Sequence, residues 1–320
     1  MNDSQVEAVN LPISILDAEF CYAMTRYANN IVIKNATFMT SIAIPENCHI
    51  NSLAVFLSTV KQIEFEQNNY IKQLVVRMSD LRKIPPTIHK LENLLEATFQ
   101  ISYLESVDLS LFCPSASILK LDLFRNNITT VTGVSRDVVC QSALKIINLN
   151  GNKIKELSLD VFSSFKRLVM LDLSQNKLES LGGSLANPEL KQLSLTNNQL
   201  TVLDMCTWSK PIEKLGLHVA HNNLTEIPRC IEALGDVTFV DLRFNRIREV
   251  DVQALHKLPK LECIHFAYNN ITAIPMDESL YPPTLKILKV HNNPLANVST
   301  PIVSFNRLNI ILDRRSISYG

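Results

Sequence analysis

The sequence predicts an α/β solenoid, a curved horseshoe of about 12 stacked repeats with a parallel β-sheet on its concave face. Two observations predict this fold. The pattern LxxLxLxxNxL returns along most of the 320 residues, with Ile, Val or Phe in place of Leu. The segments between these copies also repeat, as an LxxxxFxxLxxL-like pattern in 157–168 and 250–261, or with Ile-Pro in 84–91 and 227–234.

The copies are clearest in the second half of the chain. They occupy residues 118–128, 144–154, 168–178, 190–200, 237–247, 261–271 and 285–295, with an offset copy at 215–224. Their ninth positions are Asn126, Asn152, Asn176, Asn198, Asn222, Asn245, Asn269 and Asn293, at steps of 26, 24, 22, 24, 23, 24 and 24 residues. A repeat of roughly 20–29 residues with this signature is the leucine-rich repeat. Each unit should supply one short parallel strand, a turn and an irregular or helical return segment.

The same phase extends backward in a weaker form. Copies at 94–104, 71–81 and 50–60 have Ser102, Ser79 and Ser58 in the asparagine position, and 29–38 has Ala36 there. The two earliest copies are less defined, because residues 63–68, instead of 50–60, could supply the strand of the second repeat. We expect an N-terminal cap or extension at 1–28, the solenoid at 29–295 and a degenerate C-terminal cap at 296–320. Since each unit buries its apolar edge against neighbours, the array is expected to be one cooperative body.

The template positions have distinct physical roles. The first, fourth, sixth and eleventh positions should point into the core. The asparagine follows the strand, where backbone groups lose their sheet partners. Its side-chain amide both donates and accepts, so it can bond the backbone of its own and the next repeat. Serine can do this only in part.

Composition and motifs exclude several functions. The 31 basic and 31 acidic residues cancel, which argues against a nucleic-acid partner. The sequence contains no apolar run of about 18 residues, so no membrane-spanning helix is expected. No phosphate-binding, metalloprotease, GxSxG or CxxC motif is present, so neither catalysis, a cofactor nor a metal site is expected. The first 20 residues do not resemble a signal peptide, so the protein either stays in the cell or has a leader that this numbering omits.

A narrower resemblance comes from NIVIKNATF (30–38), IKQLVVRMSDLRKIP (71–85) and the repeats that follow. Among extracellular leucine-rich repeat proteins, these segments resemble the repeat domains of mosquito leucine-rich immune proteins. The resemblance implies a secreted, non-enzymatic scaffold of innate immunity. Its protein partner would be a complement-like thioester protein or another leucine-rich repeat chain. This sequence departs from that family because no cysteine follows Asn293 and Pro294, and no coiled coil is present. An intracellular scaffold that docks onto an enzyme remains the alternative.

The spacing of the cysteines bears on whether the protein is secreted or intracellular. Stacked repeats should align their ninth-position asparagines in a ladder. Cys206 and Cys230 each lie eight residues after such a ladder asparagine, so their Cα atoms should be about 5–6 Å apart, which suits a disulfide. Cys113 and Cys140 are near neighbours on the return side, and Cys21 and Cys48 flank the first strand. Cys263 is left over as a free thiol. Alternatively, all seven thiols simply fill buried repeat positions.

Asn-x-Ser/Thr sequons also favour the secretory route. They occur at Asn2, Asn35, Asn127, Asn223, Asn270 and Asn297. Three of them directly follow a ladder asparagine, where the template favours small polar residues anyway.

The third, fifth, seventh and eighth template positions should be exposed on the strands. In the last four repeats they carry most of the histidines, together with aromatic and arginine residues, which are frequent interface anchors. This candidate partner surface comprises His218, His221, Phe239, Asp241, Arg243, Phe244, Cys263, His265, Tyr268, Lys289 and His291. Phe244 and Tyr268 could instead pack beside the asparagine ladder as scaffold.

Two further features remain open. A second, apolar patch comprises Phe56, Leu57, Val75, Met78 and Ile101, unless residues 1–28 cover it. The row His218, Asp241, His265, with Cys263 nearby, could bind zinc, sense pH near pH 6–7, or be a plain polar wall.

Overall fold

The computed structural model describes residues 4–134, 140–209, 215–296, 302–304 and 307–312. Its internal contacts group the chain into two compact units, residues 1–154 with 161–170 and residues 155–160 with 171–320. In the described part of the chain, no helix is long and apolar enough to cross a membrane.

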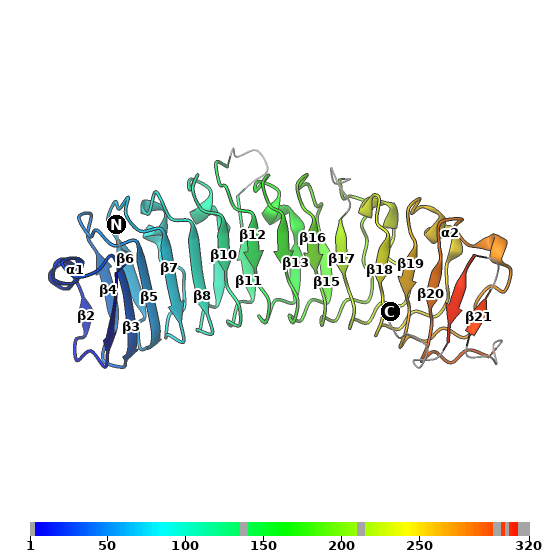
Figure 1. Cartoon of the computed structure of the whole chain (residues 1–320), viewed down its shortest axis with the longest axis horizontal. Helices are drawn as coiled ribbons and strands as arrows, with labels where there is room; N and C mark the ends of the chain where they lie inside the picture. The colour runs from blue at the N-terminus through cyan, green and yellow to red at the C-terminus, as the bar shows by residue number, and fades with distance from the viewer. Residues whose placement is uncertain (1–3, 135–139, 210–214, 297–301, 305–306, 313–320) are drawn as a thin grey trace. The chain divides into compact units, whose positions relative to one another are not determined.

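The first unit contains a parallel main sheet with one strand per repeat, paired in sequence order (Figure 1). Its strands are β1 (Gln5–Val9), β3 (Asn30–Ala36), β5 (Ser52–Ser58), β7 (Gln73–Arg77), β8 (Glu96–Gln100), β10 (Lys120–Asp122) and β12 (Ile146–Asn148). Strand β1 lies in the region expected to form a cap, and it pairs with β3 in the same parallel register, with Gln5 opposite Asn30. The sheet therefore begins one strand earlier than the repeat pattern indicates.

The return segments of the first unit form small sheets and short helices. They comprise β2 (Ile15–Leu16), α1 (Ala18–Thr25), β4 (Ser41–Ile44), β6 (Gln62–Phe65), η1 (Pro86–Lys90), β9 (Ser106–Asp108), η2 (Leu109–Phe112) and β11 (Thr130–Thr132). Strands β2, β4 and β6 pair with one another, as do β9 and β11. Residues 50–60, and not 63–68, therefore supply the main-sheet strand of the second repeat, because β5 joins the main sheet while β6 joins the smaller one.

The second unit repeats this arrangement. Its main strands are β16 (Gln192–Ser194), β17 (Gly216–His218), β18 (Phe239–Asp241), β19 (Cys263–His265), β20 (Ile287–Lys289), β22 (Asn309–Ile311) and the antiparallel β21 (Ile302–Ser304). The return segments contain β13 (Glu156–Ser158), β15 (Ser180–Gly182), η4 (Ile231–Leu234), α2 (Val252–His256) and η5 (Glu278–Leu280). Elements η3 (Leu159–Phe162) and β14 (Met170–Asp172) include residues of both units.

The asparagines form the expected ladder, and Asn222 shows its geometry. Its Nδ2 donates to the carbonyls of Leu195 at 2.9 Å and Val219 at 3.0 Å. Its Oδ1 accepts from the N–H of Leu200 at 3.1 Å. The ladder thus joins each repeat to the preceding one, and not to the next as the sequence suggested. In the same position, the enclosed hydroxyl of Ser58 has no hydrogen-bond partner among the described residues, whereas that of Ser102 accepts from the N–H of Ser79 at 3.2 Å, so serine replaces asparagine only in part.

The eighth template position has one backbone conformation in every described repeat. Its φ is positive, the left-handed region that favours Gly and Asn over other residues. These residues are Asn10, Asn35, Leu57, Met78, Ile101, Arg125, Gly151, Gln175, Asn197, His221, Phe244, Tyr268 and Asn292. The N–H groups of His221, Phe244 and Tyr268 donate to the carbonyl of the seventh position in the next repeat, at 3.0–3.1 Å. Neighbouring eighth positions therefore lie side by side with matching backbones.

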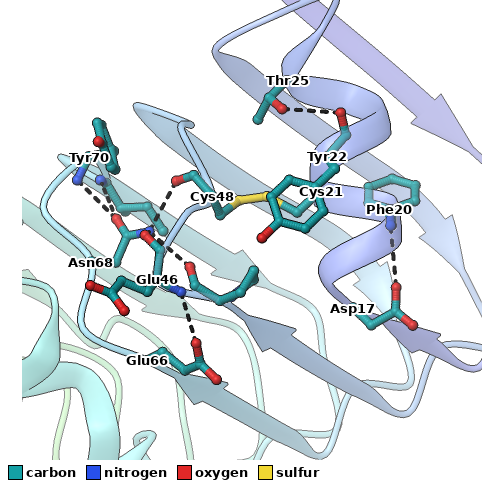
Figure 2. The surroundings of a disulfide bond; sticks show 12 residues. Asp17, Phe20, Cys21, Tyr22, Thr25, Glu46, Cys48, Glu66, Asn68 and Tyr70 are labelled. Carbon is teal, nitrogen blue, oxygen red and sulfur yellow. Dashed lines mark hydrogen bonds between the residues drawn. A yellow bond between two sulfur atoms is a disulfide. The ribbon is translucent and has the colours of Figure 1, made fainter.

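Three disulfides join the cysteine pairs that the spacing brings together. Their Cα separations are 5.8 Å for Cys21–Cys48, 4.8 Å for Cys113–Cys140 and 4.9 Å for Cys206–Cys230. Figure 2 shows the first pair, which ties α1 to the segment before β5.

The buried Asn68 organises the turn beside this disulfide. Its Nδ2 donates to the carbonyl of Cys48 at 3.0 Å, and its Oδ1 accepts from the N–H groups of Tyr70 and Ile71 (Figure 2). Disulfide and asparagine together fix the N-terminal end of the first unit.

Candidate functional site

Three rings at the eighth template position form a continuous stack, which we call the aromatic column: His221, Phe244 and Tyr268. The ring centroids of His221 and Phe244 are 4.1 Å apart, and those of Phe244 and Tyr268 are 4.2 Å apart. The ring planes differ by only 11° and 10°. The rings are parallel because identical positive-φ backbones repeat at the spacing of the strands, about 4.8 Å.

Beside the column, strand pairing aligns the expected polar row. His218 lies opposite Asp241, and Asp241 lies opposite His265. Asp241 is buried, and its carboxylate bonds Arg243 twice: Oδ2 contacts the guanidinium Nε and Oδ1 accepts from the backbone N–H, at 3.0 and 3.1 Å. Both oxygens of the Asp241 carboxylate therefore already contact Arg243. The Nδ1 of His265 lies 3.9 Å from Oδ1 of Asp241, which is too far for a hydrogen bond.

The hypothesis of a pH sensor near pH 6–7 does not hold for His265. Burial, followed by the nearby charges of Lys289, His291 and Arg243, lowers the pKa of His265 to about 4. Its Nε2 is enclosed and has no hydrogen-bond partner among the described residues. The imidazole is therefore neutral at physiological pH. Across the described ranges, no group of three or more His, Cys, Asp or Glu side chains is arranged to hold a metal ion.

The residues expected to contact a partner differ in accessibility. His218, His221, Phe239 and Arg243 are exposed, and Phe244, His265, Tyr268 and Lys289 are half-buried. Asp241 and His291 are buried and offer a partner little surface, contrary to expectation. They position Arg243 and the neighbouring rings, because His291 lies edge-on to Tyr268 at 5.9 Å between centroids.

Cys263 is the cysteine outside the three disulfides. It lies between Phe239 on β18 and Ile287 on β20 and is half-buried. Burial raises the pKa of its thiol, so the thiolate that reacts with oxidants or alkylating agents is scarce at neutral pH.

The candidate glycosylation sites are partly accessible. Asn35 and Asn270 are exposed, and Asn127 and Asn223 are half-buried. Asn2 and Asn297 lie outside the described residues.

The second, apolar patch is open to solvent in the first unit. Leu57, Met78 and Ile101 are exposed, so the described part of residues 1–28 does not cover them. The sequence interpretation missed two arginines that lie at this patch, Arg77 and Arg125. Their position in the template, seventh and eighth, was the available signal.

Comparisons with known proteins agree with this geometry. A leucine-rich repeat family model matches residues 141–178 and 236–295. This chain is a leucine-rich repeat protein. Mouse podocan, one of the extracellular leucine-rich repeat proteins that it matches, is 30% identical over 234 residues, which is 70% of this chain and 36% of podocan. Adenylate cyclase of Schizosaccharomyces pombe is 30% identical over 307 residues, 90% of this chain but 16% of that enzyme.

The structure also resembles solved leucine-rich repeat proteins. The crystal structure of the LRIM1/APL1C complex, a mosquito leucine-rich repeat assembly, aligns with a TM-score of 0.67 and 19% identity. The alignment covers 90% of this chain and 53% of that one. At the level of the fold, the expected resemblance to mosquito leucine-rich immune proteins is confirmed. The chain spans about a third of podocan and about half of the aligned mosquito chain.

Proposed function

We propose that this chain is a non-enzymatic, extracellular recognition protein of innate immunity that binds a protein partner through the aromatic column. The column carries the proposal. Phe244 and Tyr268 have a backbone conformation that glycine or asparagine would adopt at lower cost, yet both are rings and continue the stack that His221 begins. Rings of this kind are frequent binding anchors, and Phe239 and Arg243 beside them are exposed.

Disulfides and sequons support the extracellular location. Three disulfides are rare in the reducing cytosol and typical of secreted proteins. The matched relatives include extracellular leucine-rich repeat proteins. The resemblance to mosquito leucine-rich immune proteins favours a complement-like thioester protein or a second leucine-rich repeat chain as the partner.

The experiment uses a variant that keeps the backbone unstrained. Phe244→Asn with Tyr268→Asn removes two rings while placing a residue that, apart from glycine, is among those best suited to positive φ. Gln175→Asn makes the same replacement at an exposed, equivalent position and serves as the matched control. Secreted wild type and both variants are used as bait in extracellular fluid of the source organism, with mass spectrometry of the bound proteins.

We expect one protein to be captured by wild type and by Gln175→Asn and lost with the double variant. A partner retained equally by all three would overturn the assignment of the column. Seven alkylatable thiols in native material would overturn the extracellular location and favour the intracellular scaffold.

A further inference from the structure

The first unit carries a second surface of different chemistry, which we call the apolar stripe: Phe56, Leu57, Val75, Met78 and Ile101. Leu57, Met78 and Ile101 follow β5, β7 and β8 at the eighth template position. The N–H of Met78 donates to the carbonyl of Gln100 at 3.1 Å, and the N–H of Ile101 donates to that of Phe124 at 3.0 Å. The three side chains therefore stand in adjacent repeats, with 52%, 41% and 43% of their surface exposed.

Neither packing in the core nor the backbone conformation explains why these three positions carry apolar side chains. Their φ angles are 53°, 53° and 50°, a region that disfavours residues other than Gly and Asn, and β-branched isoleucine most of all. Neighbouring repeats use the favoured residue, as at Asn10 and Asn35. Exposed apolar side chains in an unfavourable conformation indicate that the side chains act at the surface.

At the seventh and eighth template positions beside the stripe the charge has a single sign, whereas carboxylates stand at other positions of the same strands, at Glu7, Glu96 and Asp122. In the seventh and eighth positions from β1 to β10, the charged residues are Lys34, Arg77 and Arg125, with no carboxylate. Lys34 pairs with Glu7 at 2.8 Å. Arg77 and Arg125 form no ion pair within the described residues.

Both unpaired guanidinium groups rest against phenylalanine rings. Arg77 lies 5.9 Å from the ring centroid of Phe56, and Arg125 lies 5.0 Å from that of Phe124. The Nε of Arg77 is enclosed and without a hydrogen-bond partner among the described residues. The two arginines are therefore held in place beside the stripe, and their terminal N–H groups, rather than the enclosed Nε of Arg77, are the donors that a carboxylate would bond.

We propose that the apolar stripe is a second docking surface, for an extended segment of a protein partner that carries apolar side chains beside carboxylates. From β5 to β10 the surface crosses three strand spacings, about 14 Å, which about four extended residues span. Apolar side chains would cover Leu57, Met78 and Ile101, and carboxylates would bond Arg77 and Arg125. A second copy that docked through its own stripe fits less well, because it would bring the same cations, Arg77 and Arg125, against these.

The test uses a random dodecapeptide phage library panned on the secreted wild-type protein. Phage that also bind the variant Leu57→Asn, Met78→Asn, Ile101→Asn are subtracted. Asparagine suits the backbone at these positions, so this variant should fold, and circular dichroism with a thermal melt checks this. Enriched peptides are then measured by fluorescence anisotropy.

We expect enriched peptides to combine Leu, Ile, Val, Met or Phe with Asp or Glu. The triple variant should weaken their binding at least about tenfold. Arg77→Gln with Arg125→Gln should weaken it and flatten its dependence on salt. Phe244→Asn with Tyr268→Asn, which tests the aromatic column, should leave it unchanged.

Three results would overturn the proposal: no enrichment over the triple variant, enriched peptides without carboxylates, or equal loss of binding in the aromatic-column variant. A wild-type dimer in sedimentation that the triple variant dissolves would assign the stripe to a second copy instead.

Discussion

Replacing a ladder asparagine by alanine should destabilise the protein by an amount that the hydrogen bonds define. In Asn222→Ala, the N–H of Leu200 loses its acceptor, Oδ1 of the asparagine, which lies 3.1 Å away. The carbonyls of Leu195 and Val219 each lose one donor but keep another, because Asn198 and Asn245 also donate to them.

The magnitude follows from this difference. An orphaned buried N–H costs about 2 kcal/mol, and each carbonyl that loses one of two donors costs about 0.5 kcal/mol. The expected loss of unfolding free energy is therefore about 3 kcal/mol. Urea unfolding followed by circular dichroism measures it.

Ser58→Ala is the matched comparison, at the same template position in the first unit. The enclosed hydroxyl of Ser58 has no hydrogen-bond partner in the part of the chain that the structure describes, so its removal should leave the unfolding free energy unchanged or raise it by about 1 kcal/mol. The reasoning fails if Asn222→Ala stays within about 1 kcal/mol of wild type, or if Ser58→Ala is equally destabilising.

Three other predictions concern titration, redox state and modification. Because the pKa of His265 is about 4 in the folded protein and about 6.5 unfolded, its contribution to stability is present above pH 6.5 and lost as the pH falls toward 4. NMR titration should show that midpoint, and His265→Gln should make the acid loss of stability shallower. Alkylation in denaturant, followed by peptide mapping without reductant, should find Cys263 alkylated and the other six cysteines linked as three pairs, and a linked Cys263 would contradict this. Secreted protein should carry a glycan at the exposed Asn270, so that Asn270→Gln lowers the mass by one oligosaccharide, whereas an unchanged mass would exclude occupancy there.

The repeat period explains what the sequence could predict. The inward-pointing template positions are buried, as at Leu190, Leu193, Leu195 and Leu200. Each repeat has one main-sheet strand, so the same template positions face the core in every repeat. The same phase brings Cys206 within 4.9 Å of Cys230, measured between Cα atoms, although they are 24 residues apart. Equivalent positions become neighbours in space, so sequence spacing alone places them.

The repeat period places a side chain but does not predict its contacts, and these contacts determine its protonation, its partners and its exposure. His218, Asp241 and His265 align as the spacing predicts, but only the structure shows that Asp241 is committed to Arg243 and that burial keeps His265 neutral. Strand β1 escaped the pattern because residues 5–9 lack the ladder asparagine and join the sheet through backbone pairing. The positive φ of the eighth position, set by the turn that ends each strand, decided that the rings of Phe244 and Tyr268 stack. The exposure of Leu57, Met78 and Ile101 was predicted from the template, but only the structure shows that the described part of residues 1–28 leaves them uncovered.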